Sequence, residues 1–216
     1  MATNDPDSAS TPSRAAIDLL VWLVEGAFER DDNHAVLVNL ASVSDAEWSA
    51  LPPGGGRTIA EIVEHVAWCK WMYEDYAFGS STLAGDKPPL VPAAGGRARP
   101  RAELMEWLIE GHRRWVASIQ QLADDPELDK PRLTNWGEWL PTRTIIGILM
   151  AHDLYHAGEI NHLRALLSGH IELFERALVE LTGIGESRVA SIVHERGGAS
   201  LDALLMKAGL PEITFP

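Results

Sequence analysis

The chain has 216 residues, of which 46% are hydrophobic and 23% are charged. It is therefore long enough to bury a substantial core in one large domain, or in one domain with a small appendage. Its net charge of −13 argues against a general binder of nucleic acids or anionic membranes. The single cysteine, Cys69, excludes an internal disulfide framework and a thiolate-rich zinc knuckle. We expect a cytoplasmic protein, because no apolar run approaches about 20 residues and the polar N-terminus does not resemble a signal peptide.

The first half of the chain predicts two long amphipathic helices. Residues 1–13 are small and polar, and we expect them to be disordered. The first helix follows and runs to about Arg30, with its apolar residues on one side. The second opens at Thr58, whose spacing from Glu61 is that of a capping box, and runs to about Phe78.

The connections on either side of the second helix differ in composition. Residues 31–57 contain Ser44 and Glu47 at capping-box spacing, which predicts a short helix there. Residues 79–100 are rich in glycine, proline, serine and alanine. So long a loop is unusual inside a compact domain. It could be a lid over a site or a tolerated insertion.

Two more helices are predicted over Arg101–Ala123 and Thr142–Leu167, and no strand pattern competes with them. The sequence therefore predicts an all-α protein, with a four-helix bundle over residues 14–168. The pattern changes after Gly169, where shorter helices predict a separate small unit over residues 171–216.

The fourth predicted helix carries an unusual pair of histidines. His152 and His156 lie about 40° apart around the helix and interrupt its apolar stripe. A buried imidazole needs a hydrogen bond or a metal, and His65 occupies the apolar side of the second helix. The three could be satisfied core residues, or they could hold one metal ion with a coordination position left open. Cys69, one turn after His65, is either a further ligand or an inert core cysteine.

Two further polar residues fall on the inner faces of the predicted helices. Glu159 shares the stripe of His156, so it could orient a ligand histidine or carry a proton. Alternatively it pairs with Arg164, Arg113 or Arg114 inside the bundle. His112 occupies a stripe position on the third helix, where it is either a pocket residue or part of the core.

The segments 58–68 (TIAEIVEHVAW) and 152–161 (HDLYHAGEIN) resemble the two histidine motifs of the DinB superfamily, also called the DinB/YfiT-like metalloenzymes. The resemblance covers about residues 14–168. It implies a four-helix bundle, often dimeric, and a divalent metal, zinc or nickel, held by His65, His152 and His156.

The resemblance also implies an activity. Characterised relatives are thiol S-transferases that use bacillithiol, mycothiol or glutathione, and a mycothiol-dependent isomerase. The isomerase branch has a glutamate where this chain has His152, so the S-transferase branch fits better. The expected substrates are a small-molecule thiol, activated by the metal, and an electrophile that the thiol attacks. A metal-dependent hydrolase and a non-catalytic bundle remain the alternatives.

The tail around residues 181–205 resembles a helix-hairpin-helix of the ComEA-like kind. In that motif Gly183 and Gly185 would offer backbone N–H groups to a DNA phosphate, and Arg188 matches a position that is often basic. However, residues 171–216 hold seven acidic and four basic side chains, which disfavours contact with nucleic acid. A packing or dimerisation appendage is the alternative.

Overall fold

The computed structural model describes residues 13–52, 55–83, 100–182 and 185, and it is almost entirely helical in these ranges. In chain order the elements are α1 (Ala15–Glu25), the π-helical turn η1 (Gly26–Arg30), α2 (Val36–Ala41), α3 (Asp45–Ser49), α4 (Ile59–Phe78), α5 (Arg101–Gln120), the 3-10 helix η2 (Asp125–Asp129), β1 (Pro131–Leu133), β2 (Trp139–Pro141) and α6 (Thr142–Thr182).

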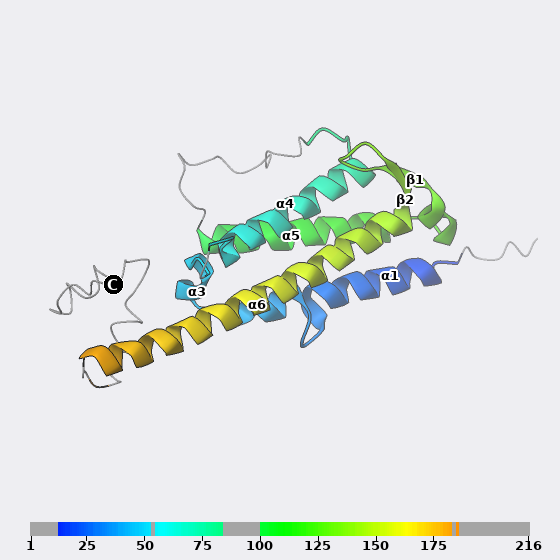
Figure 1. Ribbon diagram of the computed structural model, residues 1–216. Coiled ribbons are helices and arrows are strands. Elements are labelled where there is room, and N and C mark those ends of the chain that lie inside the picture. The colour runs from blue at the N-terminus through cyan, green and yellow to red at the C-terminus, as the bar shows by residue number, and fades with distance from the viewer. Residues whose placement is uncertain (1–12, 53–54, 84–99, 183–184, 186–216) are drawn as a thin grey trace, which may run out of the picture.

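Four long helices, α1, α4, α5 and α6, lie alongside one another as a bundle (Figure 1). Each contributes fully buried apolar side chains to one core, for example Ile17, Ile62, Leu108 and Leu149. Burying such side chains stabilises the fold by about 1.5–3 kcal/mol each. The predicted all-α fold is confirmed.

Local capping signals place the start of α4. Thr58 accepts a hydrogen bond from the backbone N–H of Glu61, and the Glu61 carboxylate accepts one from the N–H of Thr58, as the capping box predicted. The same reciprocal pair joins Ser44 and Glu47 at the start of α3. Because the cap fixes the first residue of α4, it also fixes the direction in which His65 points two turns later.

The fourth predicted helix is longer than the sequence pattern indicated. The expected end near Leu167, with shorter helices following Gly169, is wrong, because α6 continues without a break to Thr182. A glycine within a helix costs about 1 kcal/mol relative to alanine, and this did not suffice to end the helix at Gly169. The end of α6 extends beyond the other three helices (Figure 1).

A small antiparallel hairpin precedes α6, although no strand was predicted. β1 and β2 pair with Pro131 opposite Pro141. The turn between them contains Gly137 at φ +88°, a backbone conformation that favours glycine. The Thr134 N–H donates to the Glu138 carbonyl at 2.8 Å and closes the turn. The hairpin lies across one end of the bundle (Figure 1).

Several expectations concern parts of the chain outside the described residues. These are the disorder expected for residues 1–12, the loop over residues 84–99, and the tail from residue 186 onward. Among the helices that the structure describes, none has the length and apolar character needed to cross a membrane.

Candidate metal centre

Three histidines meet where α4 and α6 lie together. His65 comes from α4, and His152 and His156 come from successive turns of α6. The Nε2 atom of His152 lies 3.1 Å from Nε2 of His65 and 3.1 Å from Nε2 of His156. The rings of His65 and His156 are 5.0 Å apart, centroid to centroid. The structure therefore brings together all three histidines that the sequence singled out.

Each of the two nitrogen–nitrogen separations at His152 fits a pair of ligands on one divalent cation. Zinc–nitrogen bonds of about 2.0–2.1 Å place two ligand nitrogens about 3.3 Å apart at a tetrahedral angle and about 2.9 Å apart at a right angle. The two observed separations of 3.1 Å fall between these values. Neutral imidazoles carry only one N–H each, so a cation among the Nε2 atoms would satisfy lone pairs that otherwise face one another.

Burial keeps the three imidazoles in the neutral form that binds metals. Desolvation, followed by the nearness of His156 and His65, lowers the pKa of His152 to about 3. Desolvation also lowers the pKa of His65, with a further contribution from His156. The pKa of His156 is lowered by burial as well, although the Glu159 carboxylate opposes the shift.

Glu159 fixes the orientation of His156. Its Oε2 atom lies 2.6 Å from Nδ1 of His156. Since a carboxylate accepts hydrogen bonds, Nδ1 carries the proton, and Nε2 of the neutral ring is left bare beside His152. Arg57 donates to both oxygens of Glu159, at 3.1 and 3.2 Å, and completes a chain of three side chains.

The arginine partner of Glu159 was not predicted correctly. Arg164 pairs with Glu47, and Arg113 and Arg114 pair with glutamates elsewhere. Arg57 takes the place beside Glu159 because it immediately precedes the cap of α4. The position before a helix cap was the available signal, but nothing local in the sequence reveals that α6 passes there.

Cys69 lies at the edge of the same cluster. His65, Cys69 and His152 offer ligand atoms that lie within 4.8 Å of one another, so this set could also hold a metal ion. The Cys69 sulfur is 3.8 and 3.9 Å from the two ring nitrogens of His65. Burial raises the pKa of its thiol to about 12. The structure thus offers two candidates for the third ligand beside His65 and His152, namely Cys69 and His156.

His112 lies in the core, with a different set of neighbours. Its ring stacks on Phe28 of η1 with centroids 3.7 Å apart. Its pKa is lowered to about 2 by burial and, secondarily, by the charge of Lys70. His112 is therefore placed with Phe28 and Lys70, and a role in catalysis stays a prediction.

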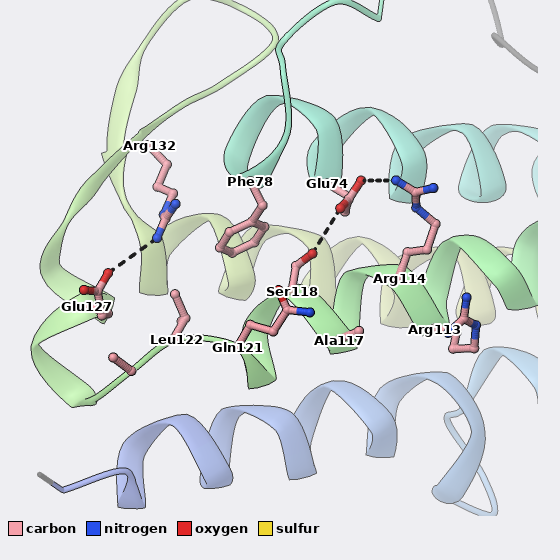
Figure 2. Close-up of a pocket in the computed structure, with 11 residues that line it drawn as sticks. Glu74, Phe78, Arg113, Arg114, Ala117, Ser118, Gln121, Leu122, Glu127 and Arg132 are labelled. Carbon is pink, nitrogen blue, oxygen red and sulfur yellow. Dashed lines mark hydrogen bonds and ion pairs between the residues drawn. The ribbon is translucent and has the colours of Figure 1, made fainter.

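A cavity of about 570 Å³ lies in another part of the bundle, between α4, α5 and the segment that leads into β1 (Figure 2). Glu74 bridges Arg114 and Ser118 on its wall, and Glu127 faces Arg132. Every cationic side chain that lines it is paired with a carboxylate. None of the three histidines lines this cavity, so the candidate metal centre is a separate place in the bundle.

The predicted nucleic-acid contacts at Gly183 and Arg188 lie outside the described residues. Gly185 is described and exposed. The helix-hairpin-helix itself is therefore not shown.

Two family models match most of the described residues. The sequence model of the DinB superfamily matches residues 28–160, which include all three histidines. A family described as an uncharacterised protein conserved in bacteria (DUF2336) matches residues 144–216, where the helix-hairpin-helix was expected. No curated protein matches the chain. Because the first match spans more than half of the sequence and carries the residues of the candidate metal centre, the chain belongs to the DinB superfamily.

Proposed function

We propose that this protein is a metal-dependent thiol S-transferase whose metal is held by His65, His152 and His156. The observation that carries the proposal is the meeting of three Nε2 atoms from α4 and α6, with 3.1 Å between successive nitrogens. Three protein ligands leave a coordination position for a substrate, as catalytic sites require and structural sites do not.

A divalent metal at this place would bind a small thiol and stabilise its thiolate at neutral pH. The protein's own residues prepare the site for it. His65, His152 and His156 stay neutral because burial lowers their pKa values. Glu159 and Arg57 hold the His156 ring, which keeps its free nitrogen directed inward.

The nucleophile in this proposal comes from the substrate. With its pKa raised to about 12, the thiol of Cys69 is almost wholly protonated at neutral pH and is a weak nucleophile. The thiol would give its proton to solvent, its sulfur would form a bond to the electrophilic carbon, and the leaving group would depart with the electron pair of the broken bond. A hydrolase that uses the same residues is the rival, with water in place of the thiol.

The test measures metal content first and then transfer. The purified protein should carry about one divalent metal per chain, and the metal-free protein should bind zinc, nickel or cobalt. With chlorodinitrobenzene as electrophile, a panel of small thiols should show metal-dependent formation of the thioether and release of chloride. Ester cleavage without any thiol would favour the hydrolase.

The matched control uses two histidines of α6. His152→Ala should abolish metal binding and transfer, whereas His162→Ala should leave both unchanged, because His162 is exposed on the same helix. If the wild-type protein holds no metal, or if His152→Ala retains full metal content, the proposed function is wrong.

A further inference from the structure

We propose that the buried ion pair between Lys70 and Asp153 is a positioning device that sets the axial register of α4 against α6 and thereby places His65 opposite His152. This inference rests on the proposed function, because it concerns how the metal ligands are held. Lys70 and Asp153 are positioning residues and touch neither metal nor substrate.

The pair lies directly behind the candidate metal centre. The Lys70 ammonium and the Asp153 carboxylate are 2.7 Å apart, and their side chains are 0% and 1% exposed. Asp153 follows His152 in α6, and Lys70 comes five residues after His65 in α4. At about 100° per residue, each charge points well away from the histidine on its own helix. The same two helices therefore meet through the histidines near the surface and through the ion pair in the core.

A contribution to the stability of the fold does not by itself explain why this ion pair is buried. Removing two charges from water costs several kcal/mol per ion, and well-packed apolar side chains would often serve stability equally well or better. The compensation here is incomplete, because Oδ1 of Asp153 has no hydrogen-bond partner among the described residues. The remaining support for Lys70 includes the face of Phe28, whose centroid lies 4.7 Å from the ammonium nitrogen.

What the pair supplies is a contact with a fixed length and direction. Apolar side chains can slide past one another, whereas a buried hydrogen-bonded pair is satisfied in one register, as polar residues in coiled-coil cores show. Neighbouring residues of a helix differ by about 1.5 Å along its axis, while metal–ligand bonds tolerate only about 0.2 Å. A slip of a fraction of one residue between α4 and α6 would therefore separate the nitrogens of His65 and His152.

The surroundings of Lys70 connect the pair to the other two long helices. Phe28 belongs to η1, which continues α1, and His112 of α5 stacks on Phe28 at an interplanar angle of 9°. With Lys70 on α4 and Asp153 on α6, each of these four segments contributes one side chain to the same place. The register is thus defined against the whole bundle.

The experiment compares two double variants in the full chain, with Co²⁺ as the probe. Lys70→Met with Asp153→Ala removes both charges and the directional contact. Lys70→Gln with Asp153→Gln has the same combined reach in side-chain atoms and keeps a neutral hydrogen bond. Each protein is measured for its thermal unfolding midpoint without metal, its Kd for Co²⁺, and the visible absorption of the bound ion.

We expect the Met/Ala variant to unfold within a few degrees of wild type but to bind Co²⁺ roughly 10–100-fold more weakly, with altered absorption. The Gln/Gln variant should keep the Kd within about threefold, because its contact remains directional. The matched control is Arg114→Met with Glu74→Gln, which removes an ion pair between α4 and α5 on the cavity of Figure 2 and should leave the Kd unchanged.

Three results would overturn the inference. One is a Met/Ala variant with the Kd and absorption of wild type. Another is a Gln/Gln variant that unfolds like wild type but loses Co²⁺ affinity, since charge and not register would then matter. The third is an equal loss in the control pair. If the Met/Ala variant does not fold, the Gln/Gln variant alone decides. Failure of wild type to bind Co²⁺ would instead refute the proposed function and remove the ligands to be positioned.

Discussion

His112 should make this protein sensitive to acid. The residue is 6% exposed, and its ring stacks on Phe28. Neither of its nitrogens has a hydrogen-bond partner among the described residues, so nothing compensates a positive charge on the ring. Burial, and then the charge of Lys70, lowers its pKa to about 2. The folded protein therefore keeps His112 neutral at pH values where the unfolded chain protonates it.

The sign and size of the effect follow from this difference. A histidine in an unfolded chain has a pKa of about 6.5. Because the folded pKa is lower, the contribution of His112 to stability is fully present above about pH 6.5 and is lost as the pH falls toward about 2. Between pH 7 and pH 5 the unfolded chain gains most of one proton at this residue while the folded chain gains none. Integrating the linkage relation over that range gives a loss of about 2 kcal/mol.

The assay is urea unfolding of the metal-free protein at pH 7 and pH 5, for wild type and for His112→Leu. The loss of unfolding free energy between the two pH values should be about 2 kcal/mol larger in wild type than in the variant. Other titrating groups are common to both proteins and cancel in the comparison. His162→Leu, which removes an exposed histidine, should behave as wild type does. Equal losses in wild type and His112→Leu would refute the reasoning.

Three further predictions test the site and its frame. Glu159→Gln should weaken Zn²⁺ binding roughly 10–100-fold by calorimetry, because His156 loses the carboxylate that orients it; an unchanged Kd would show that the contact does not orient the ring. Cys69→Ala should change that Kd by less than about threefold, since its thiol is held protonated, and a thiolate-to-metal absorption band in wild-type protein loaded with Co²⁺ would contradict this. Arg14→Met should cost about 1–3 kcal/mol in urea unfolding, because the guanidinium caps carbonyls at the end of α5, including that of Gln120 at 2.9 Å; no loss would mean that water replaces these bonds.

The parts of this fold that the sequence predicted are those set by local chemistry. The capping boxes at Thr58 and Ser44 place two helix starts, because a cap and its partner are only three residues apart. The i and i+4 spacing of His152 and His156 places both rings on one face for the same reason. Local rules therefore sufficed wherever the interacting groups lie within one helical turn.

Local rules did not predict three features of the structure. Gly169 lowers helix propensity, yet α6 passes through it. Pro131 and Pro141 carry no strand signal, yet they pair across a hairpin that lies over the end of the bundle. Arg57 meets Glu159 across 102 positions of the chain. The partner of Arg57 is far away in the sequence, so no local pattern indicates this contact.

The contact between α4 and α6 has two polar layers, and their order has a physical reason. Ligand residues must be reachable by a substrate, and His65 and His152 are partly exposed. A contact that sets register must be protected from water, because an exposed ion pair contributes at most about 1 kcal/mol and is easily replaced by solvent. Lys70, fully buried, meets that requirement. His152 and Asp153 are consecutive residues of α6, so their side chains differ in direction by about 100°. One therefore joins the partly exposed histidines and the other joins the buried ion pair. Exchanging the two layers would leave histidines that no substrate reaches and an ion pair too weak to hold them.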